Sequence, residues 1–547
     1  MSGMSFSRPR NKEQRARKLS PESSKVTSVY KEKSGERGVI CTAGTDRMMS
    51  VFPLLSLAVS FLLTIIFLLS FWRKQKKYQF LPPGPVPLPL LGTPKYIGDR
   101  AACKYFPELS RKYGPVFTVW KLTDPVVVLC GYEVVKDALL NHGDEFSGRP
   151  LAPVIDLYSE GYSFPSLEGE RWRQLRRFTI SSLRNFGMGK TSMERRVLEE
   201  SGSLVSAVTL IEGKPFNPLN LLGCAVGNIT SYALLGEHFD YEDPKLQELI
   251  TTTRRFIFNT HSPLHELGNT FPVLLNVPIL KDKIFKESSQ LISFVRKYIE
   301  QHKESLNPSA PRDFTDYFLI KIKEEEDISG SNFTDTSLLM TLIALLAAGT
   351  ETTTSTLNFS LLLMSNYPDV QAKVQQEIDE VTGSQRPAGI MDRPQMPYTN
   401  AVVHEVQRVL DLAPVAHYHA VTKETHFRGY TIPKGTTVIP FISSVLSDST
   451  QWETPEEFNP GHFLDDDGQF RQRSAFMAFS AGKRICAGEN LARMELFLLF
   501  SALLQKFTFT LPPGAERQDC RQLKQNKIRS LFFPQVCAEP RPVSGTP

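Results

Sequence analysis

The sequence is poor in cysteine, lacks repeats and, outside its N-terminus, has almost no excess of charge, and each shortage argues against a class of protein. Its seven cysteines are scattered over 547 residues without a closely spaced pair. This distribution argues against a disulfide framework and against a zinc or dithiol site, and it fits a reducing compartment. No repeat, low-complexity tract or second linker follows residue 91, so we expect one large domain over 92–547.

The formal net charge of +5 is concentrated in the first residues. Residues 1–47 hold eleven Lys or Arg against five Asp or Glu, a net of +6, which leaves −1 for the remainder. A nucleic-acid-binding domain needs a basic surface, and nothing in the remainder suggests one. Residues 1–50 form a basic extension without hydrophobic periodicity, which we expect to be disordered or absent from the working protein. Translation from Met48 or Met49 would remove it.

The first strong signal is an uncharged stretch of 22 residues, Val51–Trp72. As a helix it spans about 33 Å, enough for a hydrocarbon core of about 30 Å. The basic cluster in 73–77 follows bulky aromatics, which favours a retained anchor over a cleaved signal peptide and places that side in the cytosol. Four basic residues in 31–50 weaken this orientation. Residues 73–91 form a basic, proline-rich linker that is stiff because proline fixes φ.

The sequence after the linker predicts mostly helical structure. Apolar residues recur at spacings of three and four in 368–381, 398–410 and 491–507, as in amphipathic helices. Short β-like runs, 126–129 and 436–441, are few. We therefore predict a mainly α fold with small β-sheets, preceded by a single N-terminal transmembrane helix.

The chemistry is concentrated around one cysteine, Cys486. The segment Phe479-Ser480-Ala481-Gly482-Lys483-Arg484-Ile485-Cys486-Ala487-Gly488 fits F-x-x-G-x-R-x-C-x-G at every fixed position. Cys486 could be only a small buried hydrophobe. However, Gly482 and Gly488 allow backbone N–H groups to point at the sulfur, and a helix from Glu489 directs its N-terminus at a thiolate. The segment resembles the haem-binding loop of the cytochromes P450, which implies haem b with Cys486 as axial iron ligand.

A second cluster interrupts a long apolar helix at Gly349-Thr350-Glu351-Thr352. The mainly apolar run Leu338–Gly349 has 12 residues before the charge, too few to cross a membrane, so we expect a buried core helix. An acid is costly to bury and Thr and Gly are poor helix formers, so packing explains the cluster badly. It resembles the family's A-G-x-[DE]-T-T block, which implies that Gly349 lets the helix open and that Glu351 and Thr352 pass protons. A capping or packing role is the alternative.

Further cofactor contacts are implied by the resemblance. Arg484, two residues before the ligand, is placed to pair with a haem propionate, and Phe479, Gly482 and Gly488 belong to the same loop. The family's W-x-x-x-R pattern matches Trp172 and Arg176, and Arg149 and His419 match other propionate-side positions. A surface cation–π pair for Trp172 and Arg176, and an ordinary strand histidine for His419, are the alternatives.

A third pattern, Glu405-Val406-Gln407-Arg408, is structural rather than catalytic. The spacing E-x-x-R alone is weak, since Glu170 and Arg173 share it. In the family the Glu and Arg form a buried network with a later residue, here expected at His462, where many relatives carry Arg. A histidine makes that corner pH-sensitive in principle.

The resemblance extends from Leu81 to about Pro534, and its segments 183–189 and 476–484 resemble those of the microsomal family-two enzymes of vertebrates. It implies a monooxygenase for xenobiotics, fatty acids or steroids that uses O₂ and takes electrons from NADPH through cytochrome P450 reductase, with cytochrome b5 as a second candidate donor. We expect a single-pass protein of the endoplasmic reticulum with its catalytic domain in the cytosol, and sequons Asn228, Asn332 and Asn358 left unglycosylated. Candidate reductase contacts are Lys483, Arg471 and Arg473.

Two other functions remain open: a haem-thiolate isomerase or lyase that works without reductase, and a haem-binding sensor without turnover. Neither needs the proton path that Glu351 and Thr352 would supply. The segment 256–278 is apolar with scattered polar residues and is expected to roof a lipophilic pocket. Its composition does not identify the substrate.

Overall fold

A computed structural model describes residues 56–62, 64–65, 78–88, 90–96, 98–186, 191–260, 262–383, 386–415, 417–525 and 535–542. The chain divides into two compact units, Met1–Lys77 and Tyr78–Pro547. In the first unit, residues 56–62 and 64–65 are helical and exposed. The predicted N-terminal extension and most of the predicted anchor lie outside the described residues.

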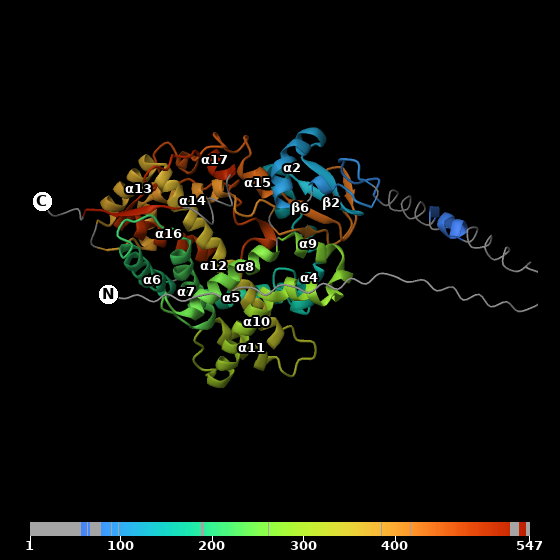
Figure 1. The fold of residues 1–547 in the computed structure, drawn as a ribbon, viewed down its shortest axis with the longest axis horizontal. Coiled ribbons are helices and arrows are strands. Elements are labelled where there is room, and N and C mark those ends of the chain that lie inside the picture. Colours follow the sequence, from blue (N-terminus) through green and yellow to red (C-terminus); the bar gives the residue numbers. More distant parts are fainter. Residues whose placement is uncertain are drawn as a thin grey trace, which may run out of the picture. The chain divides into compact units, whose positions relative to one another are not determined.

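Helices dominate the second unit, as predicted (Figure 1). The longer ones are α2 (Asp99–Tyr113), α5 (Gly169–Asn185), α6 (Thr191–Thr209), α7 (Leu219–Leu235), α8 (Pro244–Thr260), α10 (Pro278–Ser305), α11 (Phe314–Glu324), α12 (Asp335–Asn366), α13 (Pro368–Val381), α14 (Pro397–Leu410) and α16 (Glu489–Lys506). The shorter ones are η1 (Pro94–Tyr96), α3 (Tyr132–Lys136), η2 (Asp137–Asn141), α4 (Pro153–Ser159), α9 (Pro263–Thr270), η3 (Pro272–Asn276), η4 (Ile390–Gln395), α15 (Ile442–Leu446), η5 (Pro460–Phe463), η6 (Gly482–Arg484) and α17 (Cys520–Gln525).

The strands form three small sheets. The largest has the order β1-β2-β6-β3, built from β1 (Val116–Lys121), β2 (Asp124–Leu129), β6 (Thr437–Pro440) and β3 (His419–Ala420). Strands β2 and β6 are parallel, with Val127 opposite Val438, and the other neighbours are antiparallel. The remaining sheets are the pairs β4–β5 (Thr425–Phe427 with Tyr430–Ile432) and β7–β8 (Phe507–Thr510 with Cys537–Pro540).

The predicted elements match the observed ones closely. Helices α13, α14 and α16 begin and end within two residues of the predicted segments, and β2 and β6 contain most of the two predicted β-like runs. These segments follow a simple apolar period because each has one face on the core. The mainly α fold with small sheets is confirmed.

Helix α12 is the central element of the core. The Thr334 side chain accepts a hydrogen bond from the Ser337 N–H (3.1 Å), completing a capping box that starts the helix. The helix ends before Pro368, which disfavours helical φ and ψ in the preceding residue. Among the described helices, α12 alone is long and apolar enough to cross a membrane, but 67% of its most apolar window is buried inside the domain. It is therefore a core helix, as predicted.

Candidate haem site

The loop before α16 folds around Gly482 in a way that only glycine permits. Gly482 has φ +69°, and a Cβ built there would lie 1.9 Å from the carbonyl oxygen of Leu139. The backbone of η2 therefore packs directly on the loop. The loop then turns back on itself, since the Cys486 N–H donates to the Phe479 carbonyl (3.0 Å). The spacing of the motif thus corresponds to one closed turn that ends at the cysteine.

The environment of Cys486 suits a thiolate ligand. The residue is accessible to solvent, although its sulfur is largely surrounded by protein atoms. Burial of the sulfur among protein atoms raises the pKa of the Cys486 thiol, while the N–H groups of Gly488 and Glu489 act in the opposite direction by hydrogen bonding to it. These N–H groups belong to the start of α16, where unpaired donors and the helix dipole favour negative charge. A bound metal ion would complete the stabilisation of the thiolate.

Helix α12 exposes two small side chains in the middle of the core. Ala348 and Thr352, one turn apart, are exposed, whereas Leu346, Thr350 and Glu351 around them are buried. The Thr352 hydroxyl donates to the Ala348 carbonyl (2.7 Å). Side chains at positions i and i+4 lie on the same face of a helix, and protein interiors are otherwise closely packed. Two such side chains that are exposed on a buried helix therefore face a space that the protein does not fill. This exposed pair fits a helix that passes over a flat cofactor.

A cluster of three guanidinium groups lies beside the cysteine loop. The Arg176 guanidinium donates to the carbonyl of Ile485, and Arg484 donates to the carbonyls of Ser147 (2.8 Å) and Leu167 (2.7 Å). Burial first, then mutual repulsion, lowers the pKa of Arg149 to about 10 and that of Arg484 to about 9. The negative charge of Glu168 acts in the opposite direction and raises the pKa of both arginines. Three cations with one such anion make a site for further carboxylates, such as the two propionates of haem.

Trp172 and His419 complete this propionate side. The Arg484 guanidinium stacks 3.7 Å from the centre of the buried Trp172 ring, and Arg176 lies 5.8 Å from it. His419 is buried and its Nδ1 lies 2.6 Å from the Phe146 carbonyl, so Nδ1 carries the hydrogen. Burial and the nearby arginines lower the pKa of His419 to about 3. The sequence-predicted residues Arg149, Trp172, Arg176, His419 and Arg484 therefore lie in one cluster.

The side chains of Glu351 and Thr352 have different hydrogen-bond partners among the described residues. The buried Glu351 carboxylate accepts from Arg254 of α8, with Nε 3.1 Å from Oε2, and from the Ser355 hydroxyl (3.3 Å). Burial raises the pKa of Glu351, and Arg254 limits that rise. No sequence pattern pointed to Arg254, because it lies 97 residues from its partner.

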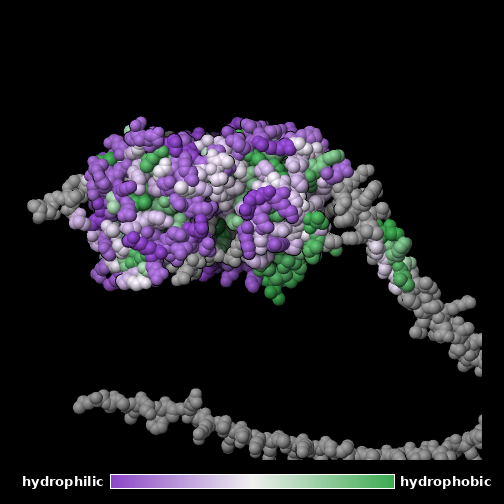
Figure 2. Space-filling view, turned by 90° about the horizontal axis from the view of Figure 1, so that it is seen from above, coloured by the Kyte–Doolittle hydropathy of each residue, from purple (hydrophilic) through white to green (hydrophobic). Residues whose placement is uncertain are grey.

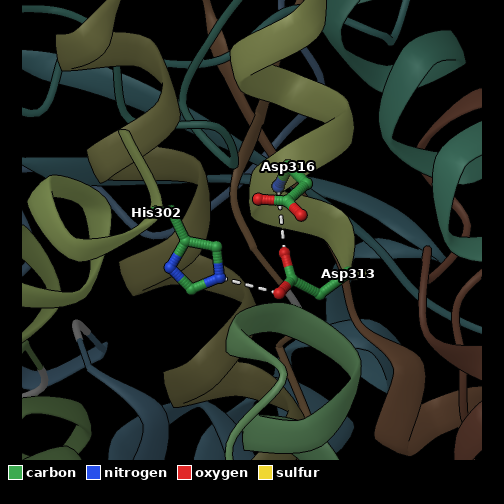
Figure 3. A group of neighbouring side chains, drawn as sticks. All are labelled: His302, Asp313 and Asp316. Atoms are coloured by element: carbon green, nitrogen blue, oxygen red, sulfur yellow. Dashed lines mark hydrogen bonds and ion pairs between the residues drawn. The ribbon is translucent and has the colours of Figure 1, made fainter. Parts of the chain in front are cut away.

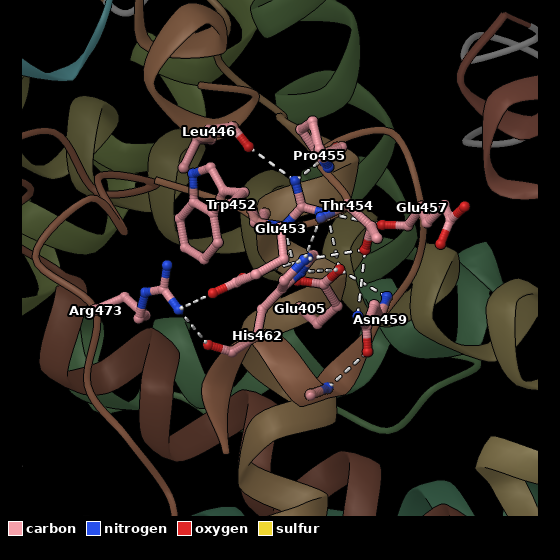
Figure 4. A network of polar contacts seen from close by, with 12 residues as sticks. Glu405, Leu446, Trp452, Glu453, Thr454, Pro455, Glu457, Asn459, His462 and Arg473 are labelled. Carbon is pink, nitrogen blue, oxygen red and sulfur yellow. Dashed lines mark hydrogen bonds and ion pairs between the residues drawn. The ribbon is translucent and has the colours of Figure 1, made fainter. Parts of the chain in front are cut away.

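The third predicted group forms a separate polar network (Figure 4). Arg408 donates to both oxygens of Glu405 at 2.7 and 2.8 Å, and both side chains are fully buried. The Thr454 N–H donates to His462 Nε2 (3.2 Å), so His462 Nδ1 carries the hydrogen that bonds Glu405 at 3.2 Å. The Asn459 N–H, which the sequence did not indicate, also donates to Glu405 (2.8 Å). His462 thus occupies the expected third position and contacts Glu405 through Nδ1.

One other group has the composition of a metal site, namely His302, Asp313 and Asp316 (Figure 3). Its ligand atoms are already engaged. His302 donates from Nε2 to Asp313 (2.7 Å), and Asp313 also caps α11 by accepting from the Asp316 N–H (2.9 Å). Arg312 binds both oxygens of Asp316 at 2.7 and 2.9 Å. The group is a hydrogen-bonded helix cap rather than an ion site.

These features together define a haem-thiolate protein. Comparison with known proteins agrees: the family model described as Cytochrome P450 matches residues 82–531. Cytochrome P450 2C8 of Homo sapiens and cytochrome P450 2C20 of Macaca fascicularis are each 45% identical over 463 residues, 84% of this chain and 93% of theirs. Cytochrome P450 2F2 of Mus musculus is 45% identical over 440 residues, 80% of this chain and 89% of its own.

The chain belongs to the cytochrome P450 family and to its microsomal family-two group. It is accordingly a monooxygenase that binds haem b, uses O₂ and a substrate, and receives electrons from a redox partner. Relatives of this group associate with the endoplasmic reticulum membrane. The donor set fits haem: a thiol beside a helix N-terminus for the iron, a cluster of three arginines near one carboxylate for the propionates, and small residues on α12.

Proposed function

We propose that Cys486 is the axial ligand of haem b and that Arg149, Arg176, Arg484 and His419, with Trp172 as packing surface, hold its propionates. The observation that carries this assignment is the cationic cluster beside the cysteine loop, in which Arg176 reaches from α5 to the carbonyl of the residue before Cys486. When bound, haem with a thiolate ligand would activate O₂ so that one oxygen atom is inserted into the substrate.

We propose that Glu351 and Thr352 deliver the protons that this reaction consumes. Thr352 is exposed toward the space beside α12 and its hydroxyl both donates and accepts. Glu351 is a buried carboxyl, and burial raises its pKa above the usual value, a shift in the direction that a proton-donating carboxyl needs. A rearranging isomerase or a sensor would have no use for such a pair.

We further infer that the electron donor is NADPH–cytochrome P450 reductase, with cytochrome b5 as a second candidate. The basic face near the cysteine loop supports this partner. Lys483 is exposed and paired with Asp144, while Arg471 and Arg473 both lie near Glu453, at 4.0 and 3.2 Å. The pairs of Lys483 and Arg471 are solvent-exposed and exchangeable, so an acidic partner could displace their internal carboxylates. Arg473 is largely buried and also donates to the carbonyls of His462 and Gln451, so it is the weakest of the three candidates.

The proposed topology is a single-pass anchor at 51–72 in the endoplasmic reticulum membrane, a linker at 73–91, and a catalytic domain, 92–547, on the cytosolic side. The proposed substrates are small lipophilic molecules of the xenobiotic, fatty-acid or steroid classes. Exposed apolar side chains on α9, η3 and the start of α10 support a lipophilic entrance: Leu267, Phe271, Val273, Val277 and Ile279. Figure 2 shows hydrophobic surface projecting at one edge of a mostly hydrophilic face.

Incorporation of labelled O₂ tests the assignment. Purified protein with reductase and NADPH would be given a panel of fatty acids, steroids and drugs, and products would be analysed for the label. We expect labelled products that require NADPH, and their loss in Cys486→Ser but not in Cys103→Ser, the same change at another exposed cysteine. Substrate rearrangement without label or NADPH would support the isomerase, and haem binding without any product would support the sensor.

A further inference from the structure

A carboxylate lies close to the proposed iron ligand. Glu489 is the first residue of α16, and its N–H, like that of Gly488, bonds the Cys486 sulfur. Its side chain acts in the opposite direction from its N–H. Burial does most to raise the pKa of the Cys486 thiol, and the negative charge of Glu489 raises it further. An uncompensated Glu489 would therefore oppose the thiolate that the start of α16 otherwise favours.

Arg493, one turn further along α16, pairs with this carboxylate. Its Nε and Nη2 lie 2.9 and 2.8 Å from Glu489 Oε1, and the two side chains are 21% and 24% exposed. The guanidinium also lies over the rings of Phe479 and Phe476, 5.1 and 5.5 Å from their centres. Phe479 belongs to the cysteine loop, because its carbonyl accepts from the Cys486 N–H. The cation thus contacts the loop as well as the acid.

A buried histidine holds the third nitrogen of the guanidinium. His404 of α14 is 4% exposed, and burial first, then Arg493, lowers its pKa to about 3, so the ring is neutral at physiological pH. Its Nδ1 lies 2.7 Å from the Asn400 carbonyl and therefore carries the single ring hydrogen. His404 Nε2 is then an acceptor, and Arg493 Nη1 donates to it at 2.5 Å.

Ordinary pairing along a helix does not account for this arrangement. An exposed Glu–Arg pair at positions i and i+4 stabilises a helix weakly and needs no third partner. Arg493 instead has a buried acceptor on another helix. It also lies near a second arginine, since burial and then the charge of Arg493 lower the pKa of Arg393. Two neighbouring cations repel each other, so the position of Arg493 has an electrostatic cost that packing alone does not explain.

We propose that Arg493, held by His404, is a positioning residue that sets the reduction potential of the haem iron by cancelling the charge of Glu489 beside the Cys486 thiolate. The inference rests on the proposed role of Cys486 as axial ligand. The step concerned is the transfer of one electron from the redox partner to the iron. A negative charge near the iron disfavours the reduced form, and a positive charge favours it. Without Arg493, Glu489 would add an uncompensated negative charge to that of the thiolate.

The midpoint potential of the haem, measured by spectroelectrochemistry on the substrate-free full-length protein, tests this role. Arg493→Gln should lower the ferrous-to-ferric ratio at a fixed potential by about three- to tenfold, and tenfold corresponds to about 59 mV for one electron. Glu489→Gln should shift the potential in the positive direction, because Arg493 then lacks its anion. The double variant should return close to the wild-type potential. Arg493→Lys, which keeps the charge, should stay closer to wild type than Arg493→Gln.

Two further variants separate the charge from the packing. His404→Phe keeps an aromatic ring among Phe463, Phe470 and Phe476 but removes the acceptor. It should shift the potential in the same direction as Arg493→Gln but by less, because Arg493 keeps its bond to Glu489. The matched control is Arg196→Gln on α6, which breaks a pair of the same length, 2.8 Å, with Glu199. Both of those side chains are more than one third exposed, so the potential should not change.

The carbon monoxide complex of the ferrous protein reports thiolate ligation in each variant. A wild-type spectrum without thiolate ligation, unchanged in Cys486→Ser, would overturn the proposed role of Cys486. If ligation by thiolate is intact, an unchanged potential in Arg493→Gln, or shifts of Arg493→Gln and Glu489→Gln in the same direction, would overturn the role of Arg493 alone. Should Arg493→Gln not bind haem, Arg493→Lys and Glu489→Gln decide: a potential near wild type and a positive shift are expected, and no shift in Glu489→Gln contradicts the inference.

Discussion

Replacement of Arg408 by leucine should destabilise the fold far more than the same change at Arg173, although both arginines end an E-x-x-R pattern. Arg408 is buried and all five of its N–H groups are used. Two bond Glu405, and three bond the carbonyls of Leu446 (2.8 Å), Pro455 (2.8 Å) and Glu457 (2.7 Å). Arg173 makes one 3.1 Å contact with Glu170, and both side chains are more than half exposed.

The expected magnitudes follow from what each change leaves behind. Arg408→Leu leaves the buried Glu405 carboxylate and three backbone carbonyls without the arginine that bonds them. Removal of one partner from a buried ion pair lowers the free energy of unfolding by about 3–5 kcal/mol. Arg173→Leu removes a solvent-screened contact worth less than about 1 kcal/mol. Glu405→Leu combined with Arg408→Leu should cost less than the sum of the single changes, because no unpaired charge then remains buried.

Denaturant unfolding of the haem-loaded protein, followed by circular dichroism and by haem release, measures these differences. The two probes should shift together for Arg408→Leu, since the network stabilises the core rather than the cofactor contacts. Equal losses for Arg408→Leu and Arg173→Leu would refute the reasoning, as would additive losses in the double variant. Either result would mean that the Glu405 charge is not isolated from solvent.

Three further outcomes are expected. Gly482→Ala should abolish haem binding, because the added Cβ would overlap the Leu139 carbonyl. Gly514 has a similar φ of +80° but open space around it, so Gly514→Ala should only lower stability slightly. The haem content of the two purified proteins distinguishes these outcomes. Burial opposes a charge on His302, but Asp313 raises its pKa overall. Its stabilisation is therefore complete below the ordinary pKa of about 6.5 and is lost as pH rises through the folded-state value; His302→Gln should flatten this decline in the denaturation midpoint. Asn332 should carry no glycan in cells, and a glycosidase-sensitive mobility shift that Asn332→Gln removes would contradict a cytosolic domain.

The sequons illustrate what sequence alone could not decide. Asn228 and Asn358 are 1% and 0% exposed, so neither can be glycosylated in the folded domain on either side of a membrane. Asn332 is partly exposed and bonds Gln174 (2.8 Å) and Arg171 (3.1 Å). The predicted test of topology is therefore informative at one of the three sites only.

Local signals predicted the parts of the site that lie within one turn or one helix. The Cys486 loop, the α12 cluster and the pair Trp172 and Arg176 all have fixed short spacings that reflect one backbone conformation. Three residues whose role depends on a distant partner, Glu168, Glu495 and Arg254, were missed. Glu168 offsets charge on Arg149 and Arg484, Glu495 is buried with its pKa raised to about 8, and Arg254 pairs across the fold. Nothing near these residues in the sequence indicates a partner.

The cationic cluster itself argues that the fold is built for an anionic cofactor. Guanidinium groups are rarely buried near one another, because burial and mutual repulsion both oppose their charge. Here these two effects depress the pKa values of Arg149 and Arg484, while Glu168 supplies one compensating charge. The cluster is therefore electrostatically costly in the protein alone and becomes favourable when carboxylates enter it. Haem binding should thus contribute to folding stability, since a ligand that binds the native state alone stabilises it by mass action.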